Sequence, residues 1–205
     1  PTLLLTVDAE LRNKTRAEIQ SGAVIRSAQG AITVTALADN QANAVIKSLD
    51  IGFGVRATIT TSRATVTSST EAVSQGEVIG ANPAVRAASV EITAQANDLA
   101  KALSDTSGGG FFSSSDATVR VTASPTVRAV GGGTILAAGD VTVKAISTAD
   151  ADASSASSSG GITDVAKLDA TADVIPKISA AIDDDAEIEA GLVLTVSATF
   201  GQDPP

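Results

Sequence analysis

The chain has 205 residues, a net charge of −9 and a pI near 4.4, and it lacks Cys, Met, Trp, Tyr and His altogether. These absences exclude a disulfide framework, a thiol nucleophile, a Cys/His zinc site and catalysis by imidazole. The 14 Lys and Arg residues are scattered, so the basic stripe of a nucleic-acid-binding protein is missing. No stretch of about 18 apolar residues is present, so we expect no membrane span.

Hydrophobic residues make up 43% of the chain, but only 2% of the residues are aromatic. We therefore expect a core of Ala, Val, Ile and Leu, which suits flat and closely spaced β layers.

Short runs of alternating or β-branched residues predict strands. In chain order they cover residues 3–11, 31–36, 55–67, 117–123, 140–146 and 192–200. Period-two alternation places every second residue inward, and we expect Thr and Ser on the side that faces water. Glycine-containing clusters at 107–110, 131–133 and 157–161 predict corners, where glycine permits a positive φ.

Residues 94–103 have good helix propensity, so their conformation is ambiguous. Their repeat mate at 147–156 is rich in Ser and predicts a poor helix. Because equivalent positions share a conformation, extended or irregular backbone is preferred, with a short helix as the alternative.

One pentapeptide recurs along the chain and defines a repeat. It reads Ile-Thr-Val-Thr-Ala at 32–36, Val-Glu-Ile-Thr-Ala at 90–94, Val-Thr-Val-Lys-Ala at 141–145 and Leu-Thr-Val-Ser-Ala at 194–198. The steps are 58, 51 and 53 residues, and a period in this range is typical of a stacked array. We divide the single array 1–205 into units 1–13 (partial), 14–68, 69–124, 125–175 and 176–205 (partial).

The predicted fold is all-β, a parallel β-solenoid (β-helix) built from degenerate repeats of roughly 50 to 60 residues. We expect two turns in each unit, with about 20 to 26 residues in a rung and about 8 to 10 rungs. An antiparallel β-sandwich stays open as the alternative, although the Asn-Gly and Asp-Gly hairpin signals are missing. No polar cap is visible at either end, and exposed terminal strands tend to pair with other chains.

Two acidic groups are the strongest candidates for chemistry. One contains Asp183, Asp184 and Asp185 followed by Glu187 and Glu189, and the other contains Asp150 and Asp152. Clustered carboxylates can hold calcium, but the spacing matches neither an EF-hand loop nor the nonapeptide calcium repeat. A solvated turn accounts for them equally well. We therefore assign no catalytic, cofactor-binding or metal-binding residue, and structural calcium is the alternative.

Two further features point to other functions. The pairs Thr33/Thr35, Thr58/Thr60 and Thr65/Thr67 are similar to the threonine ladders of ice-binding solenoids, but their spacing is irregular, so plain β-propensity explains them. Phe53 and the pair Phe111–Phe112 follow glycines and are interpreted as packed corner residues; if exposed, they would mark a lateral contact. Sugar-binding grooves rely on aromatic area, so with four Phe and no Trp or Tyr we expect no enzyme.

Residues 133–145, Gly-Thr-Ile-Leu-Ala-Ala-Gly-Asp-Val-Thr-Val-Lys-Ala, precede an Ala/Ser/Asp spacer and a Gly-Gly pair. This pattern resembles the repeats of filamentous-haemagglutinin-like and autotransporter-like β-solenoid exoproteins of bacteria. The resemblance covers nearly the whole chain and implies a parallel β-helix, an extracellular or cell-surface location, and a role in adhesion, matrix or filament formation.

The expected function is that of a structural extracellular protein, the self-assembling subunit of a surface filament, fibre or matrix. Its expected partners are copies of itself, stacked end to end. The alternative is the rigid shaft of a large bacterial adhesin, which would meet a host or neighbouring-cell surface. A carbohydrate-active or ice-binding solenoid is the third interpretation.

Overall fold

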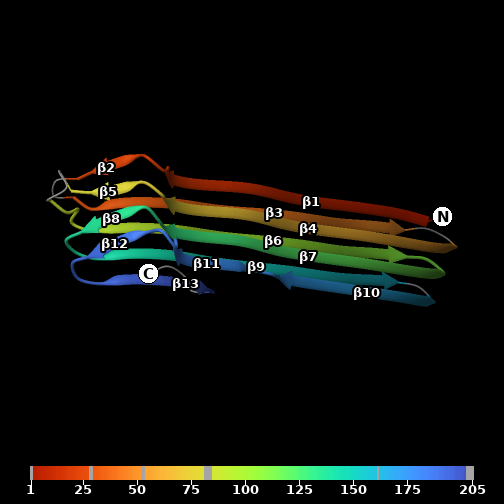
Figure 1. Cartoon of the computed structure of the whole chain (residues 1–205). Coiled ribbons are helices and arrows are strands. Elements are labelled where there is room, and N and C mark those ends of the chain that lie inside the picture. The colour runs from red at the N-terminus through yellow and green to blue at the C-terminus, as the bar shows by residue number, and fades with distance from the viewer. Residues whose placement is uncertain (1, 28–29, 52–53, 81–84, 161, 202–205) are drawn as a thin grey trace.

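The computed structural model describes residues 2–27, 30–51, 54–80, 85–160 and 162–201, and these ranges contain thirteen strands and no helix (Figure 1). Sheet A contains β1 (Thr2–Ile19), β4 (Val55–Ser74), β7 (Phe112–Gly131), β10 (Thr163–Val174) and β11 (Lys177–Ile182). Sheet B contains β2 (Val24–Arg26), β5 (Glu77–Ile79), β8 (Thr134–Ala137) and β12 (Glu187–Ala190). Sheet C contains β3 (Ile32–Ile51), β6 (Val90–Gly109), β9 (Val141–Gly160) and β13 (Leu194–Phe200).

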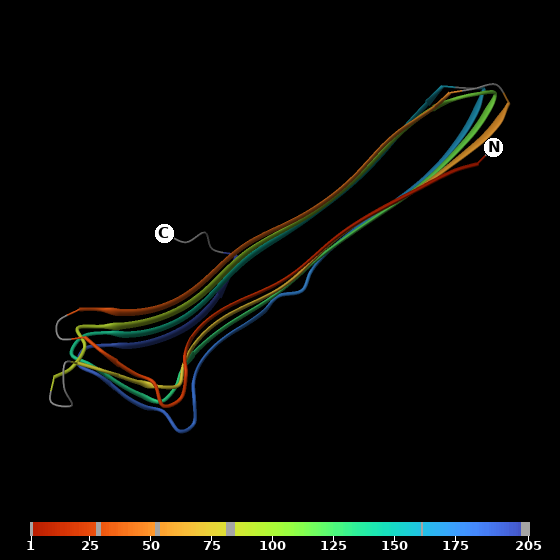
Figure 2. The ribbon, with the colours of Figure 1, turned by 90° about the horizontal axis from the view of Figure 1, so that it is seen from above.

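The chain runs through the three sheets in turn and then returns one strand lower, so each circuit forms one rung. The strand pairs within every sheet are parallel. The predicted parallel β-solenoid is therefore confirmed, and the antiparallel sandwich is wrong. Sheets A and C lie face to face and twist together along most of their length, and sheet B closes one end into a triangle (Figure 2). We call the opposite end, where β3 turns into β4, β6 into β7 and β9 into β10, the tip.

The size of the rung differs from our expectation. Ile32 pairs with Val90, Val90 with Val141 and Val141 with Leu194, so each repeat of the pentapeptide advances the chain by one whole rung. The chain thus forms three long rungs and a shorter fourth, each 51 to 58 residues from the next along sheet C, and the expected 20 to 26 residues per rung is wrong. The reason is strand length: β3, β4, β6, β7 and β9 each have 20 residues, far above the usual five or six.

Small aliphatic side chains fill the interior, as predicted. Near sheet B the core is formed by Ile, Val and Ala, including Ile92, Val127 and Ile135. In the middle of the long sheets, Ala100 and Ala102 of β6 face a row from β7 that includes Val119 and Val121. Alanine methyl groups opposite valine leave little space between the sheets, which explains why no aromatic side chain is among the buried core residues described.

Residues 94–103 lie inside β6, so the alternative of a short helix is wrong. Each backbone position of this segment pairs with β3 on one side and with β9 on the other. Its alanines at 94, 96, 100 and 102 all point into the core. The period of two and the two neighbouring strands therefore outweigh the intrinsic helix propensity of the segment.

The prediction of glycine corners is partly confirmed. Gly133 has a φ of 70° and begins the turn into sheet B, where a Cβ would lie 2.2 Å from the backbone oxygen of Gly76. Gly108 and Gly109, in contrast, are the last residues of strand β6 and not corner residues, and Gly160 ends β9.

Candidate functional site

The acidic residues that we considered as calcium ligands do not converge. Asp183, Asp184 and Asp185 form the turn between β11 and β12, where the Ala186 N–H donates to the Asp183 carbonyl over 3.1 Å. Glu189 forms an ion pair with Arg86. Within the described ranges, no group of three or more acidic side chains is arranged to hold a metal ion. The turn interpretation accounts for their positions.

Asp150 and Asp152 lie on β9, where Asp152 is in register with Lys101 and Asp150 with Leu99. Lys101 Nζ donates to Asp152 Oδ2 over 2.7 Å, from the neighbouring strand β6. The hydrogen bond and then the charge of Asp152 raise the pKa of Lys101, and the more distant Asp150 adds to this effect. The pair links the second and third rungs on the outer face of sheet C.

The threonine pairs do not share one face, so they form no ice-binding plane. Thr33 and Thr35 are exposed on β3, but the strands below place Glu91 and Lys144 in their columns. Thr58 and Thr60 are buried instead. The expectation that Thr and Ser occupy the water-facing positions is therefore only partly correct.

Toward the tip, hydroxyl groups replace aliphatic side chains between sheets A and C. The hydroxyls of Thr60 and Ser104 lie 2.7 Å apart, and those of Ser115 and Ser157 lie 2.8 Å apart. A small cavity behind them has room for about one water molecule. Of its three charged lining residues, Asp50 and Arg56 form an ion pair with each other. Hydrogen bonds from the hydroxyls of Ser159 and Ser113 lower the pKa of the third, Asp164. A cavity of this size holds no larger ligand.

A polar ladder with three buried members, Asn40, Ser68 and Asp98, and one exposed member, Asn13, was not predicted. Asn13 Nδ2 donates to Asn40 Oδ1 over 2.8 Å, and Asn40 Nδ2 donates to Asp98 Oδ1 over 2.6 Å. The Ser68 hydroxyl donates to Asp98 Oδ2 over 2.5 Å. The ladder crosses two rungs and both long sheets. The parity of the pentapeptide could have revealed it, because positions 40 and 98 share the inward parity of Ala36 and Ala94.

The interpretation of the phenylalanines as packed corner residues is wrong for the pair at the tip. Phe111 and Phe112 are each 53% exposed. Phe53 lies outside the described residues.

The first and last rungs are the largest open feature. β1, β2 and β3 end the three sheets on one side, and β10 to β13 end them on the other. Within the part of the chain that the structure describes, no strand covers either edge. All twelve residues of β10 are exposed, because β13 covers only the first seven residues of β9 and no strand of sheet C lies opposite β10.

The two open rungs match each other column by column. Leu5 pairs with Thr60, Thr60 with Ala117 and Ala117 with Leu168, so Leu5 and Leu168 lie at the two ends of one column. In the same way Leu11 corresponds to Val174. In sheet B, Ile25 lies in the same column as Ile188. In sheet C, Ile32 lies in the column of Leu194, and Val34 lies in the column of Val196. Apolar residues thus occupy equivalent inward positions on both open rungs.

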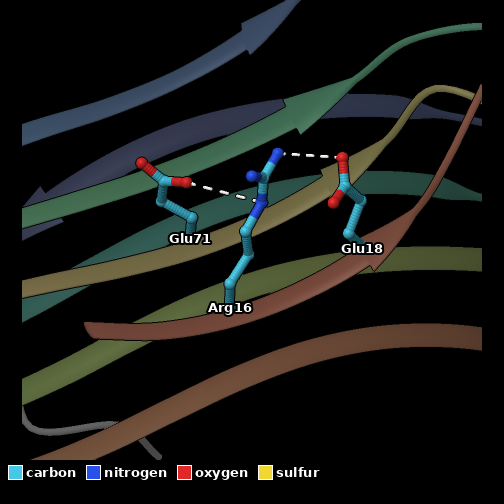
Figure 3. Close-up of polar contacts among 3 residues, drawn as sticks. All are labelled: Arg16, Glu18 and Glu71. Atoms are coloured by element: carbon cyan, nitrogen blue, oxygen red, sulfur yellow. Dashed lines mark hydrogen bonds and ion pairs between the residues drawn. The ribbon is translucent and has the colours of Figure 1, made fainter.

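The charges of the two open rungs differ. Residues 2–51 carry five cations and five carboxylates, whereas residues 162–200 carry eight carboxylates and two lysines. Two of the five cations of the first rung, Arg12 and Arg16, pair with acids of the same copy. Arg16 contacts Glu18 of its own strand at 2.8 Å and Glu71 of the second rung at 3.6 Å (Figure 3). Arg12 pairs with Glu10 at 2.6 Å.

Comparisons of the chain with protein-family models, curated proteins and solved structures gave no match. In the described ranges there is also no helix with the length and apolar character needed to cross a membrane.

Proposed function

We propose that this protein is a structural building block of an extracellular fibre or matrix, in which copies stack end to end through their open rungs. The observation that carries the proposal is the match between the two open rungs. Leu5, Leu11 and Ile32 on the first rung occupy the same columns as Leu168, Val174 and Leu194 on the last. A second copy placed in the same register would continue each of these columns.

Backbone pairing and apolar contact supply the attraction in this proposal. An edge strand presents unpaired N–H and C=O groups, which another strand can satisfy by β-augmentation. The inward side chains of the last rung are far from buried: Leu168 is 46% exposed. Covering apolar surface stabilises the contact by about 25 cal/mol per Å².

Charge opposes the stacking. Each copy carries a net charge of −9, and two of the five cations of the first rung, Arg12 and Arg16, are paired with acids of the same copy. We therefore expect added salt to promote assembly, since it screens the repulsion between copies.

The extracellular location and the family remain part of the proposal. They rest on the resemblance of the repeats to filamentous-haemagglutinin-like exoproteins, on the absence of cysteine, and on the solenoid fold. We also propose a non-catalytic role, because Asp50 at the described cavity and Asp152 on the outer face of sheet C are each paired with a cation, Arg56 and Lys101.

The second candidate is the rigid shaft of a large adhesin, with a host or neighbouring cell as its partner. The observation that favours it is the continuous register of the repeats, because further repeats of one polypeptide would continue the same columns. In that case the open rungs would be covered by the same chain.

Negative-stain electron microscopy and sedimentation velocity over a concentration series distinguish the two candidates. We expect thin fibres, and we expect Leu168→Lys combined with Val174→Lys to leave single rods, because two ammonium groups would enter apolar columns. Ile59→Lys is the matched control, since Ile59 points outward from the second rung. Short rods of the unaltered protein at every concentration and salt level would contradict self-assembly and favour the shaft. Loss of fibres in EDTA would restore the calcium alternative.

A further inference from the structure

We propose that the tip carries a lateral contact through which stacked fibres of this protein pair side by side. The contact surface, which we call the tip ridge, consists of Val55, Phe111, Phe112 and Ile162. Val55 is 69% exposed, both phenylalanines are 53% exposed and Ile162 is 75% exposed. This inference rests on the proposed stacking, because the fibre makes the ridge long.

The placement of the aromatic residues is the first argument. The chain has only four phenylalanines. Of the three that the structure describes, Phe111 and Phe112 are exposed together at the tip, and Phe200 is exposed at the end of β13. The interior uses Ala, Val and Ile, so the fold does not require phenylalanine for packing. Large exposed apolar side chains at a single location are typical of an interaction surface.

The repetition along the stack is the second argument. Val55 pairs in register with Phe112. Phe111 lies next to Ile162, since the Thr163 N–H donates to the Phe111 carbonyl over 3.3 Å. The solenoid thus brings apolar residues to the tip on the second, third and fourth rungs. In a stacked fibre the ridge would return with every copy and run parallel to the fibre axis.

The size of the ridge indicates which partner fits it. Four rungs are about 20 Å tall at the spacing of strands, and two sheets are about 10 Å thick. This area is far below the roughly 800 Å² per partner of a stable protein interface. A single rod would therefore not dimerise through its tip, whereas two fibres would add up many such contacts along their length.

A second fibre also fits the chemistry better than a membrane does. The tip ridge itself contains no charged residue. Nearby Asp50 and Arg56 pair with each other, and nearby Asp164 accepts a hydrogen bond from the Ser113 hydroxyl. A chain with a net charge of −9 is repelled by anionic lipid surfaces. An identical apolar ridge on a neighbouring fibre is self-complementary, as in other contacts between equal copies.

The test compares the unaltered protein with the double variant Phe111→Ser, Phe112→Ser in electron micrographs at low and high salt. We expect paired or bundled fibres for the unaltered protein, and single fibres of unchanged length for the variant. Leu37→Ser is the matched control, because Leu37 is exposed on the outer face of sheet C, away from the ridge. Circular dichroism checks that each variant is folded.

A cross-link gives an independent measurement, because the chain has no cysteine of its own. Ser114→Cys places one thiol beside the ridge, and Thr67→Cys places one at an exposed site of β4 far from it. With a short bismaleimide, we expect cross-linked dimers only from fibres of Ser114→Cys.

Several results would overturn the inference. Fibres of the unaltered protein that stay single at every salt concentration would contradict lateral pairing and leave end-to-end stacking intact. Bundles that persist in the double variant, or fibres that coat phosphatidylcholine vesicles instead of pairing, would contradict the ridge as the fibre contact. Absence of fibres altogether would contradict both this inference and the proposed function.

Discussion

Asn40 and Asp98 lie one rung apart in the same inward column, and the Asn40 side chain donates to the Asp98 carboxylate over 2.6 Å. Both side chains are buried, and Asp98 is only 1% exposed. The flanking inward positions of β6, Ala96 and Ala100, are alanines. In an alignment of the two rungs shifted by one inward position, Asn40 and Asp98 would each lie beside an alanine and lose this hydrogen bond. The pair therefore favours the observed alignment of the rungs over shifted ones.

The first prediction concerns this pair. Asp98→Ala leaves the Asn40 amide and the Ser68 hydroxyl without their acceptor, and we expect it to lower the free energy of unfolding by about 1–3 kcal/mol. The measurement is a urea denaturation curve. Combining Asp98→Ala with Asn40→Ala and Ser68→Ala removes the unpaired groups and should recover much of the loss. An increase in stability on Asp98→Ala alone would show that the ladder does not stabilise the fold.

The second prediction concerns the turn at Gly133. Gly133→Ala introduces a Cβ at a positive φ and 2.2 Å from the Gly76 carbonyl oxygen, so we expect a loss of about 1–3 kcal/mol or more. Gly160→Ala is the control, since a Cβ there meets no atom within 4 Å. Thermal denaturation of both variants measures the difference. Equal midpoints would contradict a strained turn at Gly133.

The third prediction follows from the ion pair of Lys101. Asp152 raises the pKa of Lys101 above its ordinary value of 10.5. The contribution of the pair to stability is therefore fully present below that value and is lost as the pH rises through the folded-state pKa. We expect Asp152→Asn to lower the pKa of Lys101 in an NMR titration, and Asp150→Asn to lower it less. An unchanged pKa in Asp152→Asn would contradict the pairing.

The fourth prediction tests the register of the proposed stack. In that register Glu10 of one copy lies beside Asp173 of the next, since both belong to the column of Thr65 and Thr122. Replacing like charges by opposite ones gains roughly 0.5–1 kcal/mol. Asp173→Lys should thus lower the concentration at which fibres form, roughly two- to fivefold.

Asp169→Lys makes the same change of charge on the same strand, β10. In the proposed register, residue 169 of one copy lies beside the uncharged Thr6 of the next copy, so no charge pair forms there. It controls for the altered net charge of the copy. If both variants assemble equally well, the stack does not use this register. Sedimentation velocity gives the threshold concentration for each.

Part of this architecture can be predicted from the sequence, and the pentapeptide shows why. Its steps equal the registers of β3, β6, β9 and β13, because every rung places the same side chains in the same column. All six predicted strand segments fall in or overlap strands of the structure. Alternation of apolar and polar residues indicates a strand wherever one face of that strand is buried.

The length of the rung and the faces of its hydroxyl residues could not be predicted. Alternation of apolar and polar residues does not show where a strand of 20 residues ends. The sequence therefore predicts two turns in each repeat, where the structure has one long rung. Thr58 and Thr65 look alike in the sequence, yet Thr58 is buried and Thr65 is half-buried on the outer face. Thr58 shares the inward parity of Val66, and Thr65 has the outward parity, yet near the tip this parity buries threonines and exposes Ile59. The buried hydroxyls find partners across the interior, such as Ser104 opposite Thr60, and only the packing of two sheets creates those partners.

The long rung also determines how the chain must fold. Neighbouring strands are 51 to 58 residues apart in the sequence, so the contacts within the sheets are non-local. Chains dominated by such contacts fold in milliseconds to seconds, because large loops must close before any pairing compensates for the lost entropy. Closing the first circuit is the slow event, and each later circuit is laid down on a strand edge that already exists. Refolding should therefore begin with a lag for an isolated molecule, and preformed rods should shorten that lag by offering their finished edges as templates.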